Sequence, residues 1–379
     1  MLHSTIRCWV GLAALRTVWH FFRKPNQGDG MKALVFNGPR DIRYETWPDP
    51  ELGSANSAIL KVESCSICGS DLHMYHGAHI GKTEYSADAP KFACGHQFMG
   101  EVVEAGSEVH GFKVGDKVLA AGGTGCGKCA QCRIGNPGKC PVVTAFGIGP
   151  GLEGGQAEFV NVPNADATLF STDGLTDEQS LLLTDAMATA YFGLTRSDPQ
   201  PGGTVAIVGL GPIGIIGVEL AFILGASRVF AIDPVKSRRD MAEALGAQVF
   251  EPGPDLQAQI AEATGGAGVQ SVFEASGAKG AIASVLPMVA SRGTASFIGI
   301  PNPDDALPLP LIMFRHITVR GGICDVPNMW PYLVPLIQSG RIRADGLFSH
   351  SFKLSEGEEA YRLFDSREDG VIKLRIDVD

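Results

Sequence analysis

The second half of the chain alternates strand-like segments with helical runs, and this alternation limits the fold more than any other feature. "TVAIVG" at 204–209 precedes an apolar helical run over 213–224, and "RVFAID" at 228–233 begins a second strand-and-helix unit. Further strand-like segments follow in "AQVFE", "SVFEAS", "TASFIGI" and "ITVRGG". Strands that are separated by helices pair in parallel, so the pattern predicts an α/β fold with a doubly wound parallel sheet.

The first half follows a different pattern. From Met31 to about Val162, short strands are broken by glycine, as in "AILKVESC" and "GDKVLAAG", which is typical of a β-rich domain. The strand-like "VIKLRIDV" ends a C-terminal tail that is too short to fold alone. We therefore predict a β-rich domain over 31–180 and 325–379, interrupted by the parallel-sheet domain over 181–324.

Residues 1–30 have a composition of their own. They carry four arginines and lysines against one acid, and their apolar stretch from Cys8 to Leu15 is too short to span a bilayer. Met31 begins the first strand-like segment. We predict an N-terminal extension that does not belong to the native fold and a cytoplasmic protein; a transit peptide and a mitochondrial location are the alternative.

The charge balance excludes some partners. Lys plus Arg is 31 and Asp plus Glu is 41, a formal net charge of −10, and the chain has no basic cluster. We expect neither nucleic acid nor an acidic membrane surface as a partner. The chain has nine cysteines, several of them closely spaced, and at this length metal ligation in a reducing compartment is favoured over disulfides.

A glycine motif joins the strand at 204–209 to its helix. Gly209, Gly211 and Gly214 have G-x-G-x-x-G spacing. These glycines allow a tight turn, approach of the backbone to a pyrophosphate, and close packing of helix on strand, while the helix N-terminus supplies N–H groups to the phosphates. Asp233 ends the next strand, where a carboxylate accepts the ribose hydroxyls and repels a 2′-phosphate. The motif predicts a site for NAD rather than NADP.

Two further residues complete this predicted cofactor site. Pro212 lies inside the glycine turn, and Arg238 follows Asp233 on the next helix. Arg238 is predicted either to flank the adenine or to be an ordinary solvated helix residue. The competing interpretation of the whole motif is a glycine-rich turn of another doubly wound protein, with Asp233 capping a loop.

Four cysteines crowd into "CGKCAQCRIGNPGKC". Cys126, Cys129, Cys132 and Cys140 form a C-x2-C-x2-C-x7-C pattern on a glycine-rich loop. Four thiolates this close together match a closed tetrahedral zinc site, which stabilises structure and leaves no room for a substrate. An iron–sulfur cluster is the chemical rival, and unligated thiols are the plain alternative.

A second group of candidate ligands lies in "SCSICGSDLH" and "KFACGHQFMGEV". In one interpretation, Cys65, Cys68, Cys94 and His96 make another closed structural zinc site. In the other, only Cys68 and His96 bind, a third ligand comes from elsewhere in the chain, and the fourth position stays open for chemistry. The spacing alone leaves both open.

Several motifs in one order resemble a known family. "CGSDLH", "GHQFMGEV", the four-cysteine loop, "GGQAEFV", "LLLTDAMATAYFG" and "VGLGPIG" together resemble the zinc-dependent medium-chain alcohol dehydrogenases, from Met31 to the end. The resemblance implies a GroES-like β-rich catalytic domain and a Rossmann cofactor domain. It implies one catalytic and one structural zinc ion per chain, and a homodimer or homotetramer, with "ITVRGG" a candidate contact edge.

The resemblance also assigns the chemical site. It implies that Cys68, His96 and Asp185 hold the catalytic zinc, with aspartate as third ligand as in the branch that resembles secondary-alcohol and formaldehyde dehydrogenases. The alternative for Asp185 is a helix-capping acid, although an unpaired carboxylate in the apolar "LLLTDAMATAYF" would be costly to bury. Ser70 and His73 would relay the alcohol proton. Thr189 and Ile213 would flank the nicotinamide.

One residue departs from the family pattern. Gln97 follows the ligand histidine where the family usually has glutamate. The predicted function is hydride transfer between a small primary or secondary alcohol and NAD, giving an aldehyde or ketone. The alternatives are a polyol, threonine-type or formaldehyde dehydrogenase, and, in another class, a zinc-stabilised dinucleotide-binding protein without turnover.

Overall fold

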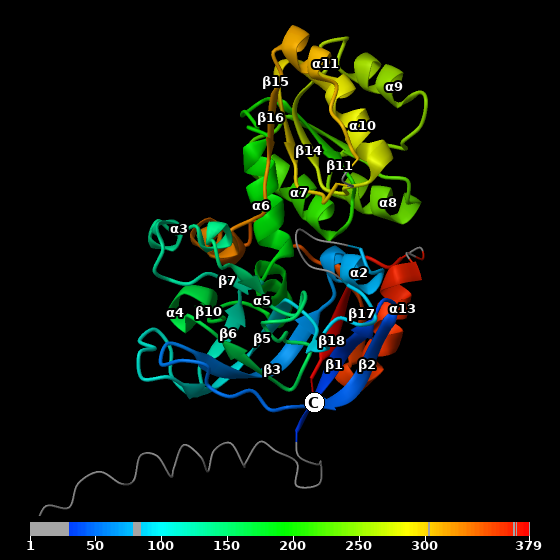
Figure 1. The fold of residues 1–379 in the computed structure, drawn as a ribbon. Helices are drawn as coiled ribbons and strands as arrows, with labels where there is room; N and C mark the ends of the chain where they lie inside the picture. The colour runs from blue at the N-terminus through cyan, green and yellow to red at the C-terminus, as the bar shows by residue number, and fades with distance from the viewer. Residues whose placement is uncertain (1–29, 79–84, 302–303, 367, 369, 379) are drawn as a thin grey trace, which may run out of the picture.

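The computed structural model describes residues 30–78, 85–301, 304–366, 368 and 370–378. Figure 1 shows a parallel sheet covered by helices, placed above a β-rich part that contains both the first and the last strands of the described chain. The predicted N-terminal extension lies, except for Gly30, outside the described residues. The predicted fold class, a GroES-like β-rich domain with a Rossmann-type parallel sheet, is confirmed.

The upper sheet is parallel throughout and doubly wound. The strand order is β13-β12-β11-β14-β15-β16, so the sequence order reverses beside β11, which pairs with both β12 and β14. Its strands are β11 (Thr204–Val208), β12 (Arg228–Ile232), β13 (Gln248–Phe250), β14 (Val269–Glu274), β15 (Val289–Phe297) and β16 (Thr318–Gly321). The helices around it are α7 (Pro212–Ile223), α8 (Lys236–Ala244), α9 (Leu256–Ala263), α10 (Lys279–Met288) and α11 (Leu309–Arg315).

The lower part is built from antiparallel pairs and one parallel pair. Its main sheet has the order β10-β6-β5-β3-β18-β17, with β9 also paired to β3. Its strands are β3 (Ala58–Ser66), β5 (Gln97–Ala105), β6 (Lys117–Ala120), β9 (Phe159–Val162), β10 (Leu169–Ser171), β17 (Phe348–Lys353) and β18 (Lys373–Asp377). Smaller sheets hold β1 (Met31–Gly38), β2 (Asp41–Trp47) and β4 (Phe92–Ala93), and β7 (Gly123–Thr124) and β8 (Thr144–Ala145).

The C-terminal tail completes this lower sheet. Strand β18 pairs antiparallel with β3, so that Ile376 lies opposite Cys65, and parallel with β17. The parallel sheet is therefore inserted between two segments that share one sheet. The remaining helical segments are α2 (Gly69–Tyr75), α3 (Ala130–Arg133), α4 (Ala165–Thr168), α5 (Asp177–Leu183), α6 (Ala186–Arg196), α12 (Trp330–Gln338) and α13 (Gly357–Ser366), with short 3-10 turns at Pro137–Lys139, Val326–Asn328 and Leu354–Glu356.

Helix α6 connects the two parts through a common core. Its buried Met187 and Leu194 belong to the same apolar cluster as Leu119 of β6 and Phe273 of β14. Burial of this cluster stabilises the two sheets against each other. The start of α6 is therefore held at the junction, and the candidate site lies there.

Candidate active site

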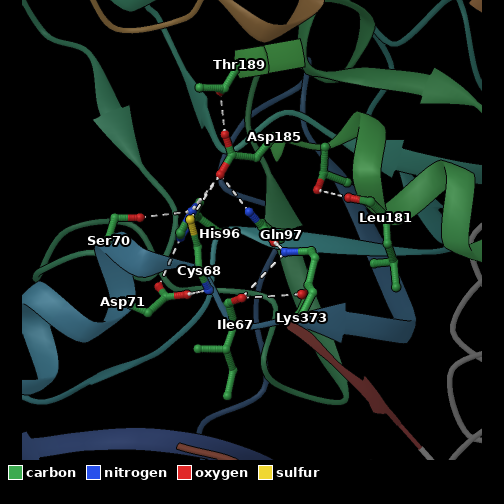
Figure 2. A network of polar contacts seen from close by, with 12 residues as sticks. Ile67, Cys68, Ser70, Asp71, His96, Gln97, Leu181, Asp185, Thr189 and Lys373 are labelled. Carbon is green, nitrogen blue, oxygen red and sulfur yellow. Dashed lines mark hydrogen bonds and ion pairs between the residues drawn. The ribbon is translucent and has the colours of Figure 1, made fainter. Parts of the chain in front are cut away.

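Three side chains from distant parts of the chain meet where α6 begins (Figure 2). Cys68 lies at the N-terminus of α2, His96 directly precedes β5, and Asp185 directly precedes α6. One possible ligand atom of each lies within 4.8 Å of the other two. Oδ2 of Asp185 lies 3.3 Å from the Cys68 sulfur and 3.5 Å from Nε2 of His96. Sulfur, imidazole nitrogen and carboxylate oxygen form a donor set that fits zinc.

The side chain of Asp185 does not cap its helix. Asp185 occupies the N-cap position of α6, yet its carboxylate makes no capping hydrogen bond. One oxygen faces Cys68 and His96, and the other accepts a hydrogen bond from Thr189 Oγ1 at 2.7 Å. The geometry therefore favours the ligand role of Asp185 over the helix-capping alternative.

Asp71 organises the cluster from behind, and the sequence reasoning did not single it out. It is completely buried, and its Oδ1 lies 3.0 Å from Nδ1 of His96. Its Oδ2 accepts the Cys68 backbone N–H at 2.7 Å. A hydrogen bond from Nδ1–H to this carboxylate leaves Nε2 as the free donor atom toward the cluster. The available signal was an acid three residues after Cys68, in the first turn of a short helix.

Gln97 touches the cluster directly. It is completely buried, and its Nε2 donates a hydrogen bond of 2.6 Å to Oδ2 of Asp185. A neutral amide can donate to this carboxylate, whereas a glutamate at the same position would present a second anion to it. Gln97, the residue that departs from the family pattern, therefore makes a specific hydrogen bond to Asp185.

Ser70 and Thr189 border the same cluster from two helices. The Ser70 hydroxyl lies 3.3 Å from Nε2 of His96, and Thr189 is on the first turn of α6. Both were predicted near the reacting groups, Ser70 as a proton carrier and Thr189 beside the nicotinamide. The structure brings both to the three-residue cluster, and their roles stay predictions.

The electrostatics of the cluster favour a cation. Burial works against the protonated form of His96, but Asp71 and Asp185 outweigh it and raise the pKa of the imidazole well above its usual value. Burial likewise works against ionisation of Asp185, yet the hydrogen bond and charge of His96 lower the pKa of that carboxyl below its usual range. Two carboxylates around one imidazole thus stabilise positive charge at Nε2, whether it is a proton or a metal ion.

The four-cysteine loop forms a second donor cluster. The sulfur atoms of Cys126, Cys129, Cys132 and Cys140 all lie within 4.8 Å of one another. Backbone N–H groups donate to the sulfurs: Cys126 N lies 3.3 Å from Cys140 Sγ, and Cys129 N lies 3.4 Å from Cys126 Sγ. Backbone N–H groups of Lys128 and Cys129 lower the pKa of Cys126 to about 6. Four sulfurs in this arrangement fit a closed tetrahedral zinc site.

Each glycine of the G-x-G-x-x-G motif stands where a side chain would not fit or would block access. Gly209 has φ +90°, and a Cβ on Gly214 would lie 1.9 Å from the Gly209 carbonyl oxygen. A Cβ on Gly211 would meet nothing within 4 Å, so the backbone there faces open space at the N-terminus of α7. The three environments match the turn, packing and phosphate-approach roles.

Asp233 lies against this turn. It is buried, its Oδ2 accepts the Leu210 N–H at 2.7 Å, and its Oδ1 accepts the Val235 N–H at 2.8 Å. Nearby, the Ser237 hydroxyl and the Arg238 Nε are buried without a hydrogen-bond partner among the described residues. Both residues lie in the first turn of α8, the helix that follows Asp233.

Known proteins share both parts of this architecture. Residues 54–171 match the family model of the alcohol dehydrogenase GroES-like domain, and residues 212–339 match that of the zinc-binding dehydrogenases. The chain is 38% identical to a probable zinc-binding alcohol dehydrogenase of Mycobacterium tuberculosis, over 87% of this chain and 84% of that protein. The chain belongs to the zinc-dependent medium-chain alcohol dehydrogenase family.

Other members of the family agree along the whole fold. The chain is 31% identical to sorbitol dehydrogenase of Bacillus subtilis, over 87% of this chain and 92% of that protein. The solved structure of alcohol dehydrogenase TADH from Thermus sp. ATN1 superimposes with a TM-score of 0.84 at 31% identity, covering 92% of this chain and all of that one. Among the described residues of the chain, no helix has both the length and the apolar character that crossing a membrane requires.

The structure does not support the interpretation in which Cys65, Cys68, Cys94 and His96 form a closed metal site. Cys65 lies in β3 and Cys94 two residues before His96, but neither joins Cys68, His96 and Asp185 within 4.8 Å. Burial raises the pKa of both thiols, as expected for cysteines packed in a core. The structure thus gives three converging donors rather than four.

The remaining residues that the sequence predicts at the site lie in α2 and at the start of α7 and α8. His73 lies one helical turn after Ser70 on α2, and its neighbour His76 pairs through Nε2 with Asp365 Oδ1 at 2.5 Å. Pro212 and Ile213 begin α7, while the Arg238 Nη2 donates to the Val371 carbonyl at 3.3 Å. Arg238 therefore contacts the C-terminal segment of the β-rich part. The roles of these residues in relay and cofactor binding stay predictions.

Proposed function

We propose that this protein is an NAD-linked zinc alcohol dehydrogenase that transfers a hydride between a small primary or secondary alcohol and the nicotinamide ring. The observation that carries the proposal is the convergence of Cys68, His96 and Asp185 beside Ser70 and Thr189. With three protein donors, the fourth position of a tetrahedral ion remains for a substrate oxygen.

The chain's own residues supply most of the chemistry around that position. Cys68, His96 and Asp185 would hold the zinc ion, which when bound acts as a Lewis acid toward an alcohol or carbonyl oxygen. Asp71 fixes the tautomer of His96 through Nδ1. The Ser70 hydroxyl would accept the alcohol proton and pass it to His73, which lies on the same face of α2.

NAD is the proposed cofactor. The Asp233 carboxylate lies at the end of β12 against the glycine turn, where it would accept ribose hydroxyls and repel a 2′-phosphate. The expected result is a kcat/KM for NAD at least ~100-fold above that for NADP, and Asp233→Ser should shrink this ratio about 10-fold or more by removing the repelling charge. Equal use of both cofactors by the unaltered enzyme would contradict the assignment.

The substrate class is proposed more broadly. A carboxylate as third donor supports the branch that resembles secondary-alcohol and formaldehyde dehydrogenases. The similarity to a sorbitol dehydrogenase supports a polyol as the alternative substrate. A threonine-type substrate is the remaining enzymatic alternative. A panel of primary, secondary and polyhydric alcohols, followed by NADH absorbance, distinguishes these classes. We further propose one structural zinc at the four-cysteine loop and a homodimer or homotetramer.

Two substitutions and one matched control test the catalytic account. Asp185→Ala and Cys68→Ser should each lose the ion of the three-donor cluster and reduce kcat/KM by on the order of 1,000-fold, because the group that polarises the alcohol is lost. Cys65→Ser is the control, since Cys65 is a buried cysteine three residues away that lies outside the cluster. It should keep both ions and its activity. Full activity of Asp185→Ala with one zinc fewer would end the proposal.

A non-catalytic dinucleotide-binding protein is the rival from another class. Cobalt exchanged into the three-donor cluster reports its coordination in the visible absorption spectrum. A spectrum that shifts when an alcohol or a pyrazole-like inhibitor is added supports an open position. A spectrum indifferent to both, together with no NADH formation across the panel, would favour the binding protein.

A further inference from the structure

A lysine is buried beneath the three-donor cluster. Lys373, in β18, is 2% exposed, and its Nζ donates to Gln97 Oε1 at 2.6 Å and lies 3.5 Å from the Ile67 carbonyl oxygen (Figure 2). No carboxylate of the described residues lies within ion-pair distance of this ammonium group. A buried ammonium without a direct anion is costly. The Phe348 ring, whose centroid lies 5.9 Å from Nζ, offsets part of this cost, and an intermediate polar group can supply further compensation.

Gln97 is that intermediate group. Its Oε1 accepts from Lys373, and its Nε2 donates at 2.6 Å to Oδ2 of Asp185. The direction of both bonds is set by chemistry, because an ammonium can only donate and a carboxylate can only accept. An amide is the side chain that can serve both ends. A glutamate at position 97 would have no hydrogen to offer Asp185 when ionised.

The charges on either side of this chain are opposite. Burial lowers the pKa of Lys373, while the nearby negative charges of Cys68, Asp185 and Asp71 counteract that effect. The Asp185 oxygen that receives the Gln97 hydrogen bond is also the one that faces Cys68 and His96. The hydrogen-bond chain therefore ends on the oxygen atom that would bind a metal ion.

We propose that Lys373 and Gln97 form a positioning pair, which conveys the charge of the buried ammonium to Asp185 and holds its Oδ2 toward Cys68 and His96. This inference rests on the proposed function only in taking Asp185 as a metal ligand. It explains why glutamine replaces glutamate at position 97 in a chain whose third donor is a carboxylate. It also assigns the C-terminal strand a role at the site, because β18 supplies Lys373 across 276 residues of sequence from Gln97.

The test measures cobalt affinity at the three-donor cluster with the four-cysteine site left filled with zinc. Lys373→Met and Gln97→Leu should each weaken cobalt binding by about 10- to 100-fold and alter the visible spectrum, as loss of a partner behind a metal ligand does. The double variant should be no worse than the weaker-binding single variant, because both changes break one chain. Lys373→Arg, which keeps the charge and the donors, should restore affinity to within about 5-fold.

A matched control separates positioning from packing. Gln156 is also completely buried, and it accepts from the Tyr361 hydroxyl and donates to the Ser66 carbonyl in the same β-rich part. Gln156→Leu should lower the unfolding temperature much as Gln97→Leu does, yet leave cobalt affinity unchanged. If Lys373→Met does not fold, Gln97→Leu and this control still decide the matter.

The outcomes distinguish this inference from the proposed function. Wild-type protein that binds cobalt with a shift on adding alcohol, alongside Lys373→Met and Gln97→Leu variants of unchanged affinity and spectrum, would overturn the positioning pair alone. Wild-type protein that takes no cobalt at Cys68, His96 and Asp185 would overturn both. Weakened binding in both variants, with rescue by arginine, would support the pair.

Discussion

The two donor clusters of this molecule are built in opposite ways. The four cysteines lie within the single loop 126–140, and their sulfurs receive hydrogen bonds from the loop's own backbone. In the other cluster Cys68 and Asp185 are 117 residues apart, and the donors come from three separate segments. A short loop can supply all four donors of a closed metal site. A three-donor site with a free position depends instead on how separate helices and strands pack together.

The surroundings of the clusters differ in the same way. The cluster of Cys68, His96 and Asp185, here called the open cluster, is surrounded by buried side chains that are not donors. Asp71 and Gln97 contact its members, and Lys373 contacts Gln97. The four-cysteine loop instead attaches to the segment around residues 323–328: Gly138 N donates to Asp325 Oδ1 at 2.6 Å, and the Lys139 side chain donates to the Ile323 carbonyl at 3.2 Å. The side chains around the open cluster position its candidate metal ligands. The contact at the four-cysteine loop holds the loop against the rest of the molecule.

The comparison predicts that losing the four-cysteine cluster mainly lowers the stability of the folded protein. Cys129→Ser should release one metal ion and lower the unfolding temperature by roughly 5 °C or more, because the loop folds around its ion. The folded fraction should retain kcat/KM within about 5-fold. Metal analysis, calorimetry and NADH formation on one preparation measure all three. Complete loss of activity at unchanged stability would break the comparison.

Loss of Asp71 should mainly affect metal binding and turnover. Asp71→Asn keeps the volume but removes the charge that orients His96, so affinity for metal at the open cluster should fall by about 10- to 100-fold. Equilibrium dialysis against a chelator measures this affinity. The four-cysteine ion serves as the internal control and should stay bound. An unchanged affinity would show that His96 is oriented by packing alone.

The anchor of the cysteine loop should have a smaller effect. Asp325→Ala removes the acceptor for the Gly138 N–H, and a hydrogen bond to a carboxylate contributes on the order of 1.5–3 kcal/mol. The loop should then open more often, and its ion should exchange faster with added cadmium, while the open cluster is unaffected. Equal acceleration at both clusters would mean that the loop and the site are coupled.

The smallest effect is expected at Thr189. Thr189→Val keeps the shape and removes the hydrogen bond to Asp185 Oδ1, which is worth about 1 kcal/mol, so kcat/KM should fall about 5-fold. Thr195→Val is a matched control, because the Thr195 hydroxyl on the same helix bonds, within the described part of the chain, to backbone carbonyls alone. An equal fall of kcat/KM in both variants would show that the Thr189 hydroxyl has no specific role at the site.

Local spacing in the sequence predicted the features that lie within one segment. The alternation after residue 181 predicted the doubly wound sheet, and the glycine and cysteine spacings predicted turns and a sulfur cluster whose members stand together in the structure. These features depend on residues a few positions apart, so their physics is present in the local chain. The third donor, Asp185, was reached only through resemblance to a family, because no spacing connects it to Cys68.

Other features were decided by tertiary structure. Nothing local indicates that Lys373 reaches Gln97 or that Asp71 reaches His96, because these contacts arise when β18 pairs with β3 and when α2 comes to lie beside the residue that precedes β5. Local spacing therefore indicated which chemistry the chain carries in its loops and turns. The tertiary structure decided which buried groups share a charge, because burial and distance exist only once the strands have paired.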